Sequence, residues 1–294
     1  MTTQTGNTLT IGGDLTVGRV GFGAMRLTGE QVWGDYPDRE AGIALLRSVV
    51  ELGITFIDTA DVYGPHANEI LIHDALFPYP PGLVIATKGG FVRGGFDYST
   101  LDAVGNPNYL RQSAQMSARR LGIEQIDLYY LHSGRATDVS FETQIETLAA
   151  LRQEGLIRHI GLSNVTLEQL RIAQTIVEIV AITAHFHAGV RTGAPFLNVC
   201  EEDELVFSPW HPLSVYEGVN RDQVKEVIAP IARRHDVTES QIALAWQLHH
   251  SVVTLPIPGT TSLAHLRENL AAQEIRLDPD EVTAITGLVP EHLA

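Results

Sequence analysis

Cysteine is almost absent from this chain of 294 residues. The one thiol, Cys200, cannot form a disulfide within the chain, and such a composition is typical of a reducing compartment, so a cytoplasmic location is expected. The N-terminal segment carries neither a basic stretch nor an apolar core, and no secretory signal is expected from it. No apolar run approaches the roughly 20 residues that span a bilayer, so no membrane partner is expected either.

Basic residues are also scarce. Lysine and arginine number 20 against 35 aspartates and glutamates, which gives a formal net charge of −15. This balance argues against nucleic acid as a partner, because phosphate contacts need clustered basic side chains. It also means that an anionic cofactor needs a local basic pocket. With 44% hydrophobic residues and no linker or charge block, residues 1–294 are expected to form one domain.

Strand-like apolar runs alternate with amphipathic helical segments along the whole chain. About eight runs are uninterrupted, as expected for parallel strands covered on both faces. They are 18–23, 54–59, 83–88, 126–132, 157–163, 181–186, 205–210 and 252–258. At this length the pattern predicts an α/β fold, a (β/α)8 TIM barrel. A doubly wound open sheet is less consistent, because the GFGAM stretch at 21–25 lacks the glycine-rich phosphate turn of that fold.

Two segments are expected to lie at the ends of the barrel. Residues 8–18 alternate around a Gly-Gly-Asp turn and predict a β-hairpin that closes the bottom, the N-terminal mouth. Residues 91–108 are glycine-rich and too long for a tight strand-to-helix connection, so we interpret them as a functional loop on the active face. Asn106 before Pro107, and Thr238 further along, are predicted helix N-caps.

Polar residues stand where three neighbouring strands are predicted to end. Asp58 ends the second strand, Lys88 the third and His132 the fourth, and Tyr63 follows Asp58 in the same loop. In a TIM barrel these positions form the active site. A buried Asp58 requires a partner such as Lys88, whose ammonium is expected to lower the pKa of Tyr63 from about 10. With His132 as a second donor, the set suits protonation of a carbonyl oxygen.

These motifs resemble the aldo-keto reductase superfamily, from GRVGFGAMRL to IPGTTSLAHLREN. IDTADVYG carries Asp58 and Tyr63, ATKGG carries Lys88, and LYYLH carries His132, the catalytic residues that the resemblance implies. The segments GAMRLTGEQVWG, VYGPHANE and ALFPYPPGL are most similar to the bacterial pyridoxal reductase-like branch.

The resemblance also implies a site for a nicotinamide dinucleotide. Ser163 and Asn164 would hold the carboxamide, and Trp210 would stack on the nicotinamide ring. The full implied set is Gly23, Met25, Asp58, Ser163, Asn164, Thr183, Trp210, His211, Pro212, Leu213, Ile257, Gly259, Thr260, Thr261, His265, Glu268 and Asn269. Trp33, Tyr63 and His132 are the implied substrate contacts.

The sequence departs from the family pattern at two places in this set. Thr183 stands where a glutamine usually helps to hold the carboxamide, so one hydrogen bond to the cofactor is expected to be lost. Gly259 and His265 stand where more basic relatives have lysine and arginine. Arg267 is nearby and no acidic residue stands at the ribose position, so NADPH is expected, with NADH possible.

The expected function is NADPH-dependent reduction of an aldehyde or ketone, with Tyr63 as the general acid. An aromatic aldehyde such as pyridoxal suits the aromatic residues predicted at the rim, Trp33 among them. The alternative is a dinucleotide-binding sensor or regulatory subunit without turnover, which has less reason to keep all four polar residues. A metal-dependent hydrolase is disfavoured, because no spacing such as HExxH is found, and no metal is expected.

Overall fold

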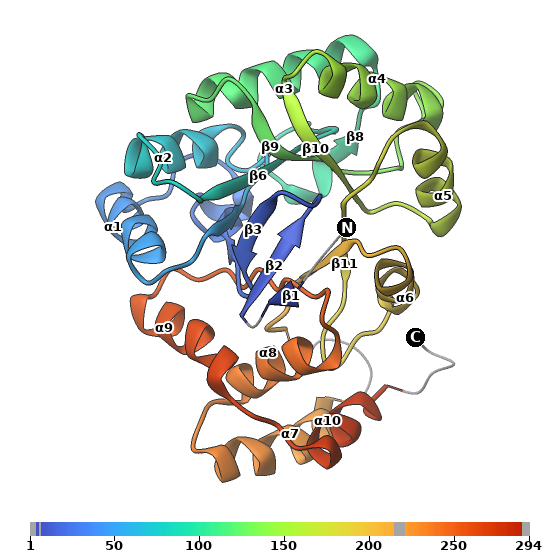
Figure 1. Cartoon of the computed structure of the whole chain (residues 1–294). Helices are drawn as coiled ribbons and strands as arrows, with labels where there is room; N and C mark the ends of the chain where they lie inside the picture. Colours follow the sequence, from blue (N-terminus) through green and yellow to red (C-terminus); the bar gives the residue numbers. More distant parts are fainter. Residues whose placement is uncertain (1–3, 6, 215–220, 290–294) are drawn as a thin grey trace.

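The computed structural model describes residues 4–5, 7–214 and 221–289, and the single-domain expectation for 1–294 therefore includes residues outside the described ranges. Its main sheet is parallel, in the order β12-β11-β10-β9-β6-β5-β4, and it curls into a barrel surrounded by helices (Figure 1). The strands of this sheet are β4 (Phe22–Gly23), β5 (Phe56–Asp58), β6 (Val84–Gly89), β9 (Ile126–Leu131), β10 (Ile157–Ser163), β11 (Ala181–His185) and β12 (Val206–Trp210). The α/β barrel predicted from the sequence is confirmed.

The eighth predicted run, 252–258, closes the barrel without forming a regular strand in the described structure. Next to β12 it forms one parallel bridge, between Thr254 and Phe207. Next to β4, Gly21 N and Gly23 N donate to the carbonyl oxygens of Pro256 and Pro258. Proline has no N–H with which to return these bonds, which explains the irregular pairing.

The predicted N-terminal hairpin is present and covers the bottom of the barrel (Figure 1). It comprises β2 (Thr8–Ile11) and β3 (Leu15–Gly18), which pair antiparallel, and a short β1 (Gln4–Thr5) extends the sheet. Its inward-facing residues pack with the barrel interior in one apolar cluster, which includes Leu9, Ile11, Leu15, Val17, Phe56, Leu128, Tyr130 and Val206. Alternation of apolar and polar residues along the hairpin is what lets one face enter this cluster.

The outer layer consists of helices whose apolar stripes face the sheet. They are α1 (Arg39–Glu51), α2 (Ala67–Leu76), α3 (Pro107–Leu121), α4 (Phe141–Gln153), α5 (Leu167–Ile176), α6 (Ala194–Glu202), α7 (Arg221–His235), α8 (Glu239–His250), α9 (Leu263–Ala271) and α10 (Pro279–Thr286). The predicted N-caps are confirmed: Asn106 accepts from backbone N–H groups of α3, and Thr238 forms a capping box with Gln241 of α8. In the described ranges no helix has the length and apolar character needed to cross a membrane.

The long segment 91–108, which was predicted to be a loop, contains regular secondary structure. It folds back as a two-stranded antiparallel hairpin, β7 (Phe91–Arg93) and β8 (Leu101–Ala103), with the 3-10 turn η3 (Tyr98–Thr100) between them. The hairpin follows β6 directly, and Phe91 lies 4.7 Å from the His132 ring, centroid to centroid. It therefore lies at the carboxyl end of the barrel, as predicted for the active face.

Candidate active site

A buried ion pair lies at the carboxyl ends of β5 and β6. Lys88 Nζ donates to Asp58 Oδ1 at 2.5 Å and to the Thr59 carbonyl oxygen at 2.8 Å, and both charged side chains are 4% exposed. Burial raises the pKa of Asp58, while the Lys88 ammonium acts in the opposite direction. An unpaired charge at either position would be costly, so the pair is held together by burial as much as by attraction.

Tyr63 and His132 lie beside this pair. Lys88 Nζ is 5.3 Å from the centroid of the Tyr63 ring, and the Tyr63 and His132 rings are 6.0 Å apart in an edge-on arrangement. Tyr63 belongs to a small apolar cluster with Ala60, Val62 and Phe91. The structure thus brings together the four polar residues predicted from the strand ends.

The predicted direction of the Tyr63 pKa shift is wrong. The pKa of Tyr63 is raised well above 10, first by burial and then by the Asp58 carboxylate. The Lys88 charge is directed at Asp58, at less than half its distance to the Tyr63 ring. Tyr63 therefore keeps its proton at neutral pH, which is the form a proton donor needs.

His132 is held in its neutral form. Its pKa lies well below 6.5, because the ring is buried and the Lys88 ammonium opposes a second positive charge. Its backbone is fixed on both sides, since His132 N donates to the Gly89 carbonyl at 2.8 Å and its carbonyl accepts from Asn164 Nδ2 at 3.0 Å. A neutral imidazole donates one hydrogen bond, which is what orienting a carbonyl oxygen requires.

Asp61 provides a second buried carboxyl group near the site, and no role was predicted for it from the sequence. Its Oδ2 accepts from Ser113 Oγ at 2.6 Å, and Ser113 Oγ lies 3.1 Å from the Tyr129 hydroxyl. Asp61 N also donates to the Lys88 carbonyl at 3.1 Å, so this residue ties the Tyr63 loop to β6. Burial raises the pKa of Asp61 to about 7. Its position two residues before Tyr63 is the signal that could have pointed to it.

We expect Asp61→Asn to remove a pH dependence of stability. A carboxyl group whose pKa is about 7 when folded and about 4 when unfolded adds stability below pH 4 and loses it as the pH rises through 7. Relative to the Asn variant, the wild type should lose roughly 2–4 kcal/mol of unfolding free energy between pH 4 and pH 8. Urea titrations at several pH values measure this difference, with Asp280→Asn, an exposed residue of α10, as the control. Parallel curves for wild type and Asp61→Asn would exclude the shifted carboxyl group.

The two predicted carboxamide-binding residues, Ser163 and Asn164, form one hydrogen-bonded group with Thr183 at the ends of β10 and β11. Thr183 Oγ1 donates to Ser163 Oγ at 2.8 Å, and Asn164 Nδ2 donates to the same oxygen at 3.0 Å. Asn164 has a left-handed backbone, with φ of 50°, immediately after the strand. Thr183, which is buried, therefore supports Ser163 from the neighbouring strand.

Trp210, predicted to stack on a nicotinamide ring, lies at the end of β12 against a histidine. The His185 ring stacks on it with centroids 4.2 Å apart and an interplanar angle of 6°. His211 packs edge-on against Trp210 at 5.0 Å. Pro212 is buried and its carbonyl accepts from Gln247 Nε2, and Leu213 is half-buried. His185 was not among the predicted site residues, although its alternation with Thr183 on β11 indicates that the two side chains lie on the same face of the sheet.

The remaining predicted cofactor residues gather where β4 meets α9. Gly23 and Gly259 lie back to back, and a Cβ atom on either would approach the backbone of the other segment to within 2.6–2.8 Å. Asn269 is 4% exposed and its Nδ2 has no hydrogen-bond partner. The N-terminus of α9 is surrounded by Thr260, Thr261 and His265, whereas Glu268 and Asn269 lie in the second half of the helix. Ile257 precedes Gly259, and Met25 packs against the Tyr63 cluster. A tight glycine cradle, the N-terminus of a helix and an unpartnered buried amide on that helix fit a dinucleotide.

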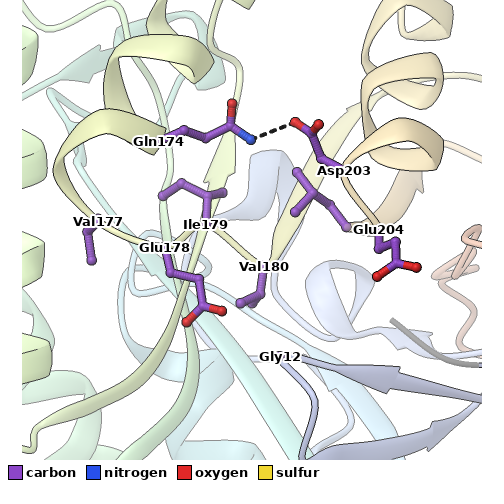
Figure 2. Close-up of a pocket in the computed structure, with 9 residues that line it drawn as sticks. Gly12, Gln174, Val177, Glu178, Ile179, Val180, Asp203 and Glu204 are labelled. Carbon is purple, nitrogen blue, oxygen red and sulfur yellow. Dashed lines mark hydrogen bonds between the residues drawn. The ribbon is translucent and has the colours of Figure 1, made fainter. Parts of the chain in front are cut away.

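Two hollows of the described structure lie away from these residues. One, of about 250 Å³, is lined at the amino ends of β11 and β12 by Gly12 of the hairpin and by Glu178, Val180, Asp203 and Glu204, among others (Figure 2). Asp203 there is paired with Arg171 and Gln174, and Glu178 with Arg152. The hollow is at the end of the barrel opposite Lys88 and His132, so it is not part of the candidate active site.

In the part of the chain that the structure describes, no three metal-ligating side chains lie close enough together to hold an ion. The imidazoles of His185, His187 and His211 are neighbours, with ring centroids 5.1 and 5.9 Å from that of His185. The rings of His185 and His211 pack against Trp210, and His187 Nδ1 accepts from Gly189 N at 3.1 Å.

A parallel α/β barrel with a buried Asp–Lys pair, a protonated tyrosine and a neutral histidine at its carboxyl end defines a class of carbonyl oxidoreductases. The comparison with protein families gives the same result, since residues 19–290 match the model of the aldo/keto reductase family. The chain belongs to this family, whose enzymes carry out NAD(P)H-dependent carbonyl reduction.

Individual relatives cover nearly all of the chain. Pyridoxine 4-dehydrogenase of Escherichia coli is 37% identical over 290 residues, which are 97% of this chain and 99% of the relative. A thermostable aldo-keto reductase solved with the inhibitor epalrestat is 26% identical and superposes with a TM-score of 0.83, over 98% of this chain and 100% of its own. An aldo-keto reductase from Klebsiella pneumoniae, solved with NADPH, is 24% identical with a TM-score of 0.79, over 98% and 97% of the two chains.

Proposed function

We propose that this protein reduces an aldehyde to the corresponding alcohol with NADPH, and that Tyr63 is the proton donor. The observation that carries the proposal is the geometry around Lys88, whose Nζ is 2.5 Å from Asp58 and 5.3 Å from the Tyr63 ring. A phenol that keeps its proton at neutral pH, next to an ammonium held by Asp58, can serve as a general acid toward a carbonyl oxygen.

Each of the four residues has a distinct task in this proposal. Tyr63 holds a proton at its hydroxyl oxygen and donates it to the carbonyl oxygen of the substrate. The Lys88 ammonium stabilises the negative charge that develops on the carbonyl oxygen of the substrate, and the ion pair with Asp58 holds Lys88 in place. Neutral His132 donates a hydrogen bond that orients the same oxygen. The surrounding apolar residues exclude water from the transfer.

The residues that would hold the dinucleotide are those at the rims of β10, β11, β12 and α9. Ser163 and Asn164 would bind the carboxamide, Trp210 and His185 the ring end, and the Gly23–Gly259 cradle with Asn269 the adenosine end. The cofactor supplies a hydride to the carbonyl carbon when bound. The NADPH found with the Klebsiella pneumoniae structure supports this choice of cofactor.

An aromatic aldehyde is the substrate class that we favour. Trp33, Phe96 and Tyr98 are large, exposed aromatic residues of the loops that carry Val32 and Phe91, two members of the group packed around Tyr63. Aromatic side chains at a rim pack well on a planar ring. The name of the E. coli relative, pyridoxine 4-dehydrogenase, supports pyridoxal as the first candidate.

A panel of carbonyl compounds tests the proposed function. NADPH oxidation is followed with pyridoxal, benzaldehyde, an aliphatic aldehyde of similar size and a ketosugar, each over a range of concentrations. We expect kcat/KM to be highest for the planar aromatic aldehydes. NADPH binding without turnover of any member would favour a sensor or regulatory subunit instead.

We also expect NADPH to be preferred to NADH, by a modest factor. Thr260 and Ser262 lie at the N-terminus of α9, and Arg267 on the same helix supplies a positive charge for a 2′-phosphate. A single exposed charge contact is worth about 1 kcal/mol or less, so Arg267→Ala should reduce the preference roughly fivefold at most. The ratio of kcat/KM for the two cofactors measures it, and Arg276→Ala, outside α9, serves as the control. A preference for NADH would contradict this part of the proposal.

A further inference from the structure

A strained turn lies against the loop that carries Tyr63. Gln31 and Val32, in the 3-10 turn η2 (Glu30–Val32), both have left-handed backbone conformations, with φ of 56° and 55°. Residues other than glycine adopt this region at a cost, and the cost is greatest for a β-branched residue such as Val32. Strain of this kind persists only where surrounding contacts hold it, and it is found most often at functional sites.

Arg93 provides the contacts that hold this turn. Its Nη1 donates to the carbonyl oxygens of both strained residues, Gln31 at 3.0 Å and Val32 at 3.2 Å, and its Nη2 donates to the Phe96 carbonyl at 2.7 Å. The guanidinium also lies over two aromatic rings, 5.3 Å from the centroid of Trp33 and 5.1 Å from that of Tyr98. One side chain thus joins the η2 turn to the β7–β8 hairpin.

The η2 turn also contacts the loop that carries Tyr63. The Val32 carbonyl accepts from Gly64 N at 3.1 Å, and the Val32 side chain packs against the cluster of Ala60, Val62, Tyr63 and Phe91. Gly64 is packed so closely that a Cβ atom would lie 2.7 Å from the Gly34 carbonyl oxygen, and its φ is 73°. The η2 turn and the Tyr63 loop are therefore closely packed, with Val32 against the cluster that contains Tyr63.

We propose that Arg93 is a positioning residue for the reduction, which holds the η2 turn in its strained form and through it fixes Tyr63 and the substrate mouth. The inference rests on the proposed role of Tyr63. The planar fork of arginine bonds the η2 turn through Nη1 and the Phe96 carbonyl of the hairpin through Nη2 at the same time, and a lysine, with one terminal nitrogen, cannot replace it.

The main test compares Arg93→Met with Arg93→Lys. Both variants should lower kcat at least tenfold, because both lose the fork, while the dissociation constant for NADPH stays within twofold of wild type. Guanidinium ion added to Arg93→Met should restore part of kcat, since it can occupy the emptied position between the rings. Arg111→Met, which removes a guanidinium paired with Glu154 on the outer helices, is the control and should change neither constant.

A second variant separates positioning from general damage. Gln31 is exposed, and glycine adopts a φ of 56° without strain, so Gln31→Gly lowers the cost of the turn and removes no buried contact. When Gln31→Gly is added to Arg93→Met, kcat should rise by about fivefold, the factor expected when the backbone strain of one left-handed residue is removed. Gln31→Gly should have little effect when Arg93 is present.

Hydrogen exchange provides a readout that does not depend on turnover. In Arg93→Met the amides of Trp33 and Gly64, both bonded within this contact, should exchange faster, while those of β9 stay unchanged. If the wild type showed no NADPH-dependent turnover while these amides exchanged faster in Arg93→Met, the proposed function would be rejected. The structural role of Arg93 would still stand. Unchanged exchange, a kcat within twofold of wild type, or no recovery by Gln31→Gly would each overturn the role of Arg93.

Discussion

Tyr63→Phe is expected to abolish most of the aldehyde reduction and to leave the protein folded with its cofactor affinity intact. The change removes the hydroxyl group that donates the proton and keeps the ring in its cluster with Ala60, Val62 and Phe91. General acid catalysis contributes on the order of 10²–10⁴-fold, so kcat should fall within that range. Single-turnover measurements with saturating NADPH follow the chemical step directly, and fluorescence titration follows binding.

Tyr130→Phe is the matched control for this experiment. Tyr130 is a fully buried tyrosine of β9 whose ring lies 5.9 Å from Lys88 Nζ, and its hydroxyl lies beside the Ser208 side chain. Loss of one neutral hydrogen bond costs about 1.5 kcal/mol at most, so Tyr130→Phe should stay folded and keep its activity. If Tyr63→Phe kept more than about a third of the wild-type kcat, the range expected for general acid catalysis would not be met and the proton donor would have to be another group.

Lys88→Met should cost both activity and stability. The variant leaves the Asp58 carboxylate buried without its partner, and breaking a buried pair in this way costs roughly 3–5 kcal/mol. The pKa of Asp58, already raised by burial, must rise further without the ammonium. A raised folded-state pKa means that stability is present when the carboxyl group is protonated and is lost as the pH increases. The destabilisation should therefore be larger at pH 8 than at pH 5.

The double variant Lys88→Met with Asp58→Asn separates the two effects. It removes the uncompensated charge, so much of the unfolding free energy should return and its pH dependence should weaken. Turnover should stay low, because the charge beside Tyr63 is still missing. Chemical denaturation at both pH values and NADPH oxidation by the same preparations supply the two readouts. Recovery of turnover in the double variant would show that Lys88 serves only to neutralise Asp58.

The barrel and the identity of its polar residues follow from the sequence alone. Uninterrupted apolar runs at regular spacing predicted the parallel strands, because a strand covered on both faces has no polar side to show. The placement of Asp58, Lys88 and His132 at strand ends then followed from one geometric fact, that the carboxyl ends of parallel strands meet at the same rim. The helix caps at Asn106 and Thr238 could also be predicted from the sequence, because capping depends on residues that are close in the chain.

Only the tertiary structure decided the features that depend on the distance between segments far apart in the sequence. The direction of the Tyr63 pKa shift depended on whether Lys88 pairs with Asp58 or with the phenol, and on how deeply the ring is buried. The bonds from Arg93 to Gln31 and Val32 join residues about 60 positions apart and have no local signal. The stack of His185 on Trp210 likewise joins two strands. Electrostatics and packing fall off over a few ångströms, so they are settled by the folded neighbourhood and not by order along the chain.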